Sequence, residues 1–223
     1  KKLKAIDCSS PDKIARTAGE LRACIYSHKI PEKIRTELFA TIRSLLKNDC
    51  FVAVRSSALG EDSKEFSYAG MLDTCLFRRT DEEVCEAVVT CWSSIFSDRA
   101  VAYRNMRGIP QDDVSMAVVV QEMIDGVASG VTFTVNPTTR YQDEILITSV
   151  FGLGEGLVSG TLDSDQFICL KKENYPVIEK QLADKVEKLV FDREKNYGTK
   201  TVEVPADQAK KPSLSEAQLR SIA

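Results

Sequence analysis

The sequence Phe51-Val-Ala-Val-Arg-Ser-Ser-Ala58 is an apolar, β-branched run that stops abruptly at an arginine and two serines. It predicts a buried strand over 50–54 that delivers Arg55 and two hydroxyls to its carboxyl end. Ligands of α/β proteins bind at that edge of the sheet. A guanidinium there suits a phosphate, because it keeps its charge and donates two hydrogen bonds in a fork. A structural ion pair at the strand end is the alternative.

Helices and further strands are expected on both sides of this run. Ser10-Pro11-Asp12 predicts a helix start, and a second helix is expected from Pro31 to Lys47. Thr80 with Glu83 forms a capping box ahead of a third helix. Strands are expected at the β-branched segments, namely 71–77, 114–123, 131–135, 144–150, 166–170, 177–181, 186–191 and 201–204. Segment 114–123 is apolar enough in its centre to be buried on both faces.

Composition limits the class of protein. The chain has 223 residues, of which 43% are hydrophobic and 28% charged, with a net charge of −3, as in soluble globular proteins. It has no basic block, so no nucleic-acid partner is expected. No apolar run approaches the roughly 20 residues of a membrane span, and the start lacks a signal peptide. The seven cysteines include no CxxC pair, which indicates reduced thiols in a cytoplasmic protein rather than disulfides or zinc.

Several other segments contain residue types that occur in catalytic or binding sites. The only histidine, His28, lies at a predicted helix end, which argues against histidine-based catalysis. The segment Phe151-Gly-Leu-Gly-Glu-Gly-Leu-Val-Ser-Gly160 fits neither the dinucleotide fingerprint nor the P-loop, so its glycines serve either a turn or a ligand. Gln121, at the end of an apolar strand, could meet the edge of a flat base. Three aspartates could hold magnesium but are more typical of solvated turns: Asp163, Asp165 and Asp192.

Taken together, ordered blocks over residues 51–170 resemble one family. They are Val52-Ala-Val-Arg-Ser-Ser57, Ala69-Gly70 with Asp73-Thr74, Cys91-Trp-Ser-Ser94, Val120-Gln-Glu-Met123, Ala128-Ser-Gly-Val-Thr-Phe-Thr134 and Gly152-Leu-Gly-Glu-Gly-Leu-Val-Ser-Gly160. They resemble the ATP-binding domain of the phosphoenolpyruvate synthase and pyruvate, phosphate dikinase family. Rifampicin phosphotransferases share that domain. The blocks are specific for the domain and not for one enzyme of the group.

The resemblance implies an α+β, ATP-grasp-like fold that holds the nucleotide between two lobes. It implies that Arg55 contacts the ATP phosphates and that Gly70 and Thr74 form a loop closing over them, whereas Gln121 sits at the adenine hinge. Arg55 is also the one residue with an expected catalytic role, and Glu155 receives none. The implied organisation is a helical segment at 1–49, the nucleotide-binding core at 50–171, and a short-strand meander with the start of a helix at 172–223.

The family has further parts that find no match in this sequence. A glycine-rich block with a phosphate-contacting lysine, a block with the magnesium ligands, the phosphocarrier histidine domain and the acceptor domain are all missing, so the chain is expected to be truncated at both ends. The implied reaction is phosphoryl transfer from ATP to the carrier histidine and then to pyruvate or a related acceptor. ATP and Mg²⁺ are expected, with metal ligands outside this chain, and the chain alone is expected to bind ATP weakly and to be inactive. A rifampicin-type phosphotransferase, a phosphate-dependent pyruvate dikinase and a non-catalytic scaffold are the alternatives.

Overall fold

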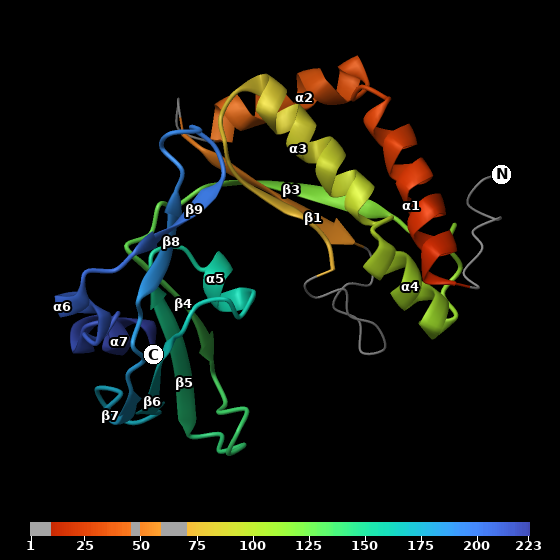
Figure 1. Cartoon of the computed structure of the whole chain (residues 1–223). Coiled ribbons are helices and arrows are strands. Elements are labelled where there is room, and N and C mark those ends of the chain that lie inside the picture. The colour runs from red at the N-terminus through yellow and green to blue at the C-terminus, as the bar shows by residue number, and fades with distance from the viewer. Residues whose placement is uncertain (1–9, 46–49, 59–70) are drawn as a thin grey trace. The chain divides into compact units, whose positions relative to one another are not determined.

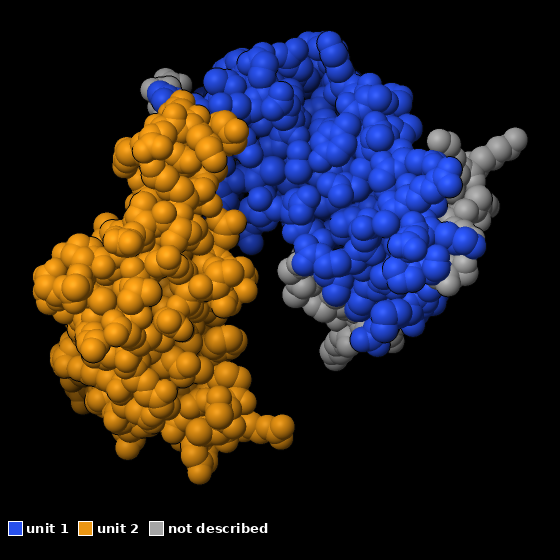
Figure 2. All heavy atoms as spheres, in the orientation of Figure 1, with its two compact units in different colours: residues 1–124 blue, residues 125–223 orange. Residues whose placement is uncertain are grey.

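The chain folds into two compact units. The computed structural model describes residues 10–45, 50–58 and 71–223. Unit 1 comprises residues 1–124 and unit 2 residues 125–223, coloured separately in Figure 2. Each unit contains helices and an antiparallel sheet (Figure 1), which agrees with the predicted α+β class. The three-part division at residues 49/50 and 171/172 stays a prediction.

The described part of unit 1 combines a three-stranded antiparallel sheet, in the order β2-β1-β3, with four helices. In chain order its elements are α1 (Pro11–Tyr26), α2 (Glu32–Leu45), β1 (Val52–Ala58), β2 (Thr74–Arg78), α3 (Asp81–Ser94), α4 (Asp98–Arg107) and β3 (Met116–Glu122). Helix α3 packs against all three strands, and α1 packs against α3 and α4.

Unit 2 combines a four-stranded antiparallel sheet, in the order β4-β5-β6-β7, with a hairpin of β8 and β9. Its elements are β4 (Ala128–Phe133), β5 (Glu144–Phe151), α5 (Glu155–Val158), β6 (Asp165–Leu170), β7 (Val177–Gln181), β8 (Glu187–Phe191), β9 (Thr199–Glu203), α6 (Ala206–Ala209) and α7 (Glu216–Ile222). Leu214 and Leu219 pack on Ile145, Ile147 and Phe167, so the segment around α7 covers one face of this sheet.

Local signals set the helix ends. The side chain of Ser10 accepts a hydrogen bond from the Lys13 amide at the start of α1. Thr80 and Glu83 form the predicted capping box of α3, and Ser215 with Gln218 forms another at α7. Each cap satisfies amide donors that have no partner within the helix, which explains why these starts were readable from the sequence.

The sheet of unit 1 has one covered face. Val52 and Val54 of β1 and Cys75 of β2 join Val84, Val88 and Cys91 of α3 and Phe39 of α2 in one apolar cluster. Figure 1 shows α2 and α3 on the same side of this sheet. Side chains alternate between the two faces of a strand, so the intervening residues of β1 and β3 point away from the cluster.

Two predictions about the strands of this sheet were wrong. Strand β1 continues to Ala58, so Arg55 lies within the strand and not at its carboxyl end, because β1 pairs with β3 along its whole length. Segment 114–123 is not buried on both faces. Exposure alternates along β3, with Val118 and Val120 facing the cluster and Val119 47% exposed. β3 is covered on one face only, because its sheet is antiparallel and the packed helices lie on one side.

Helices of the described segments were also compared with the requirements of a membrane span. None of those helices is both long enough and apolar enough to cross a bilayer.

Candidate functional site

Arg55 lies in a row of side chains that crosses the open face of the unit 1 sheet. It pairs with Thr74 of β2 on one side and with Val119 of β3 on the other. Residues directly opposite one another in antiparallel strands point to the same face. All three are exposed, and together they are called the Arg55 row below.

Gln121 lies on the same face as the Arg55 row. It follows Val119 by two residues along β3 and pairs with Ala53 of β1. The period of two along a strand therefore brings its amide to the side that carries Arg55 and Thr74. Three of the four predicted site residues thus share one sheet face, although 66 positions of sequence separate Arg55 from Gln121.

The guanidinium of Arg55 differs from those of two other arginines in unit 1. Arg35 and Arg43 pair with carboxylates on α3, at 3.6 Å to Glu82 and 2.9 Å to Asp81. None of the acidic side chains in the described segments forms an ion pair with Arg55. An exposed, permanent cation of this kind suits a phosphate better than it suits a structural ion pair.

The loop predicted to close over the phosphates contains Gly70 and Thr74. Gly70 lies outside the described residues. Thr74 is not part of a loop, because it is the first residue of β2 and is paired with Arg55. The strand fixes its place on the open face, which a loop would not do.

Two glycines in the glycine-rich segment of unit 2 lie where the surrounding packing leaves no room for a Cβ atom. Gly152 has φ of +74°, and a Cβ there would collide with the carbonyl oxygen of Leu189. A Cβ on Gly156 would collide with the side chain of Leu162. The carboxylate of Glu155 accepts a hydrogen bond from the Thr199 hydroxyl at 2.9 Å. These contacts favour a structural role for both glycines and for Glu155.

Asp165 is held in a buried network. Its carboxylate is 2.6 Å from Nζ of Lys185, and the two side chains are 0% and 1% exposed. It also accepts hydrogen bonds from the amides of Ala183 and Ser213 and from the Ser213 hydroxyl. A carboxylate with four donors is fully engaged by the protein.

Asp192 is likewise bonded within the protein, to the amides of Glu194 and Lys195. The described residues contain no group of three or more histidine, cysteine or acidic side chains that could hold a metal ion.

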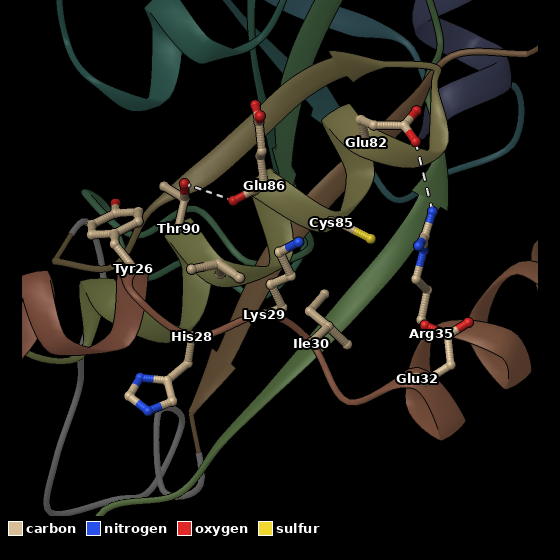
Figure 3. A pocket seen from close by; sticks show the side chains of 11 residues that line it. Tyr26, His28, Lys29, Ile30, Glu32, Arg35, Glu82, Cys85, Glu86 and Thr90 are labelled. Atoms are coloured by element: carbon tan, nitrogen blue, oxygen red, sulfur yellow. Dashed lines mark hydrogen bonds and ion pairs between the residues drawn. The ribbon is translucent and has the colours of Figure 1, made fainter.

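A hollow of about 680 Å³ lies on the helical side of unit 1 (Figure 3). Residues 28–30 and α2 line it together with α3, and its walls carry Lys29 and Arg35 as well as Glu82 and Glu86. Arg35 and Glu82 already pair with one another. Because the walls carry both positive and negative side chains, the hollow favours neither an anionic nor a cationic ligand. His28 is also here, exposed, with Nδ1 2.7 Å from the carbonyl of Cys24. None of the predicted site residues lines the hollow.

The fold and the open face describe an α+β domain that presents a cation, a hydroxyl and an amide on one sheet face. A guanidinium, a hydroxyl and an amide are groups that can hydrogen-bond an anionic ligand with a flat base. The chain belongs to the family described as pyruvate phosphate dikinase, AMP/ATP-binding domain, which matches residues 1–223. The family predicted from the ordered blocks is therefore confirmed.

Curated relatives match nearly all of this chain. A probable phosphoenolpyruvate synthase of Methanocaldococcus jannaschii is 35% identical over 225 residues, covering 99% of the chain and 19% of the relative. The phosphoenolpyruvate synthase of Helicobacter pylori is 32% identical, covering 99% of the chain and 29% of the relative. The rifampicin phosphotransferase of Bacillus subtilis is 34% identical, covering 95% and 24%. The chain therefore spans between about a fifth and a third of the length of these relatives.

Sequence reasoning missed two features of these sites. Val119 completes the Arg55 row, and only the period-two alternation between Val119 and Gln121 could have placed it on the open face. Lys185, the partner of Asp165, lies in a short polar segment with no local signal.

Proposed function

We propose that this chain is the ATP-binding part of a phosphoenolpyruvate synthase-like dikinase. The phosphoryl group of ATP passes to a carrier histidine on another domain and from there to pyruvate or a related acceptor. The observation that carries the proposal is the open sheet face with Arg55, Thr74 and Gln121 side by side on three strands. The names of the relatives, which are phosphoenolpyruvate synthases and rifampicin phosphotransferases, support it.

Each residue of the open face has one role in this proposal. Arg55 binds the phosphates and neutralises charge that develops during transfer. Phosphoryl transfer asks a protein mainly for such positioning and neutralisation. Thr74 donates its hydroxyl to a phosphate oxygen, and Gln121 hydrogen-bonds the edge of the adenine. Gly70 lets the backbone approach the phosphates closely.

The remaining parts of the proposal concern fold, metal and location. Residues 50–171 form an ATP-grasp-like core, flanked by the helical segment 1–49 and the meander 172–223. Mg²⁺ accompanies the ATP and shields its phosphate charge. Because the described residues hold no cluster of metal ligands, we assign it to none of them. The protein acts in the cytoplasm.

A rifampicin-type phosphotransferase is the second candidate. Relatives of that name match the chain at 34–35% identity, as closely as the phosphoenolpyruvate synthases do. Both candidates, and a phosphate-dependent pyruvate dikinase, share the step in which ATP is bound. They differ in the acceptor. AMP release by the gene product that contains this chain, with pyruvate, with pyruvate plus inorganic phosphate, or with rifampicin, separates them. A scaffold would bind ATP and release no AMP with any acceptor.

The site is tested by calorimetric titration of the chain with ATP and Mg²⁺. Loss of a charge-assisted phosphate contact is worth about 1.5–3 kcal/mol, so Arg55→Ala should weaken binding by about ten- to a hundredfold. Arg16→Ala is the matched control, because Arg16 is an exposed arginine of α1 whose side chain is 83% exposed and pairs only weakly with Glu20 at 3.6 Å. It changes the net charge equally and should leave the affinity unchanged.

Two milder variants distinguish binding of the phosphates from binding of the adenine. Thr74→Val keeps the β-branched shape and removes the hydroxyl, so it should weaken ATP and inorganic triphosphate alike by about two- to tenfold. Gln121→Leu should weaken ATP but not triphosphate. If the parent chain and Arg55→Ala bind ATP with equal affinity, Arg55 is not part of the ATP site. A parent chain that does not bind ATP would refute nucleotide binding by this chain.

A further inference from the structure

Two cysteines lie in the apolar cluster behind the Arg55 row. Cys75 follows Thr74 in β2 and pairs with Val54, the residue before Arg55. Because side chains alternate along a strand, Cys75 points to the covered face while Thr74 and Arg55 point to the open one. Cys91 approaches from α3 on the covered side, in the same apolar cluster. Cys75 is 8% exposed and Cys91 is fully buried.

The Cys91 thiol contacts the carbonyl groups of the residues that precede Arg55 and Thr74. It is 3.5 Å from the carbonyl oxygen of Val54 and 3.5 Å from that of Asp73. The Asp73 carbonyl also accepts the amide of Ser56 at 3.3 Å, which ties the start of β2 to β1. The Cys91 thiol therefore lies at the point where the strands that carry Thr74 and Arg55 are joined.

The two thiols also interact with one another. The neighbouring Cys91 thiol lowers the pKa of Cys75, against the effect of burial. The Cys75 sulfur, together with burial, raises the pKa of Cys91. Cys75 is therefore the thiol of the pair that ionises more readily. A thiolate beside a thiol is the arrangement from which a disulfide forms, since the first sulfur attacks an oxidant and the second resolves the product.

We propose that Cys75 and Cys91 are a thiol–disulfide pair and that their oxidation weakens binding on the open face of the sheet. The second half rests on the proposed function. The oxidant is a low-molecular-weight disulfide of the glutathione type. The Cys75 thiolate attacks one of its sulfurs, forming a mixed disulfide and releasing one thiolate. Cys91 then gives up its proton and attacks the Cys75 sulfur, which releases the second thiol. The two protein sulfurs lose two electrons, and the oxidant gains them as two thiols.

Oxidation changes the backbone contacts in a defined way. A disulfide sulfur has no hydrogen, so Cys91 can no longer donate to the carbonyls of Val54 and Asp73. Strand β2 is five residues long and pairs only with β1 among the described strands. A short strand at the end of a sheet opens locally more easily than a central one, which gives the oxidant access and makes β2 the element that shifts. Thr74 is displaced with it.

The disulfide is tested first without nucleotide. The reduced chain is incubated with glutathione disulfide, the remaining thiols are blocked, and the peptides are mapped by mass spectrometry. A cross-linked pair of the peptides containing Cys75 and Cys91, lost on treatment with dithiothreitol, is expected. Cys91→Ala should abolish it, whereas Cys85→Ala on the same helix should not. Modification of the exposed Cys24 without any Cys75–Cys91 cross-link in the parent chain would overturn the proposal, and this result needs no variant that might fold poorly.

The effect on the open face is then measured on the same samples. ATP should bind about tenfold more weakly to the oxidised chain, and dithiothreitol should restore the affinity. A cross-linked chain with unchanged affinity would overturn the inference and leave the proposed function standing. If the reduced chain binds no ATP, the proposed function fails instead. The effect is then measured as hydrogen exchange of the Ser56 amide, which should become about tenfold faster, and unchanged exchange overturns the inference.

Discussion

Lys185→Met is expected to destabilise unit 2 strongly. Nζ of Lys185 is 2.6 Å from Asp165 in a site that excludes water, with both side chains at most 1% exposed. It also donates to the carbonyl of Ala183 and lies 5.3 Å from the centre of the Phe151 ring. Methionine keeps most of the length and packing of lysine while removing its charge. The substitution therefore leaves a buried carboxylate with its three neutral donors and no cation.

Breaking a buried ion pair by removing one partner costs about 3–5 kcal/mol. Here the hydrogen bonds from Ala183 and Ser213 remain, so the lower half of that range applies. With a urea dependence of about 2 kcal/mol/M, the unfolding midpoint of unit 2 should fall by about 1.5–2 M.

The chain contains a natural probe for each unit. Cys169 is the only cysteine after Cys91 and is buried in β6, so the rate at which a thiol reagent labels it reports opening of unit 2. Trp92 is the only tryptophan and lies in α3, so its fluorescence reports unit 1. Labelling of Cys169 in Lys185→Met should begin at lower urea than in the parent chain.

The matched control is Lys210→Met in the same unit. Lys210 pairs with Asp184 at 3.7 Å, but its side chain is 81% exposed, so its loss should cost less than about 1 kcal/mol. If Lys185→Met and Lys210→Met protect Cys169 equally, the network around Asp165 does not stabilise the unit. The double variant Asp165→Leu with Lys185→Met should be less destabilised than the two single changes added together, because no unpaired charge remains.

Three further changes have outcomes that follow from single contacts. Gly152→Ala combines positive φ with a backbone collision and should cost about 2 kcal/mol or more by Cys169 labelling. Gly160→Ala, also at positive φ but in open space, should cost about 1 kcal/mol, and equal losses would rule out the collision. Thr80→Ala removes the capping box and should lower the unfolding free energy by about 1 kcal/mol in Trp92 fluorescence; an unchanged value would contradict the cap. Burial raises the pKa of Asp192, but hydrogen bonds from the amides of Lys195 and Glu194, with the charge of Lys200, outweigh it and hold that pKa below its ordinary value. The contribution of the Asp192 carboxylate to stability is therefore present above about pH 4 and is lost as the pH falls through its pKa in the folded state. In acid, Asp192→Asn should therefore lose less protection of Cys169 than the parent chain does. Identical acid curves would refute this.

Features fixed by neighbours in sequence were predictable. The starts of α1 and α3 depend on caps within three residues of Ser10 and Thr80, and each was predicted from residue type alone. Arg55 and Gln121 were predicted as polar residues at the ends of apolar strands, and the family blocks selected them further.

Features fixed by distant partners were not predictable. The apolar run of β3 gave no indication that one of its faces is open, because that depends on which side the helices pack. The pairing of Lys185 with Asp165 joins positions 20 residues apart across unit 2. The contacts of Cys91 with the carbonyls of Val54 and Asp73 join positions 37 and 18 residues apart. Neither leaves a periodic signal in the sequence.

The central place of β1 in its sheet has a consequence for how the chain can vary in length. β1 is paired on both sides, with its odd-numbered residue Arg55 on one face and its even-numbered neighbour Val54 on the other. Deleting one residue between 51 and 53 would slide the strand by one step and exchange every side chain between the faces. The guanidinium would then point into the apolar cluster and the valine into water. We therefore expect insertions and deletions among members of this family to avoid β1 and to fall in connections such as residues 27–31 and 108–115.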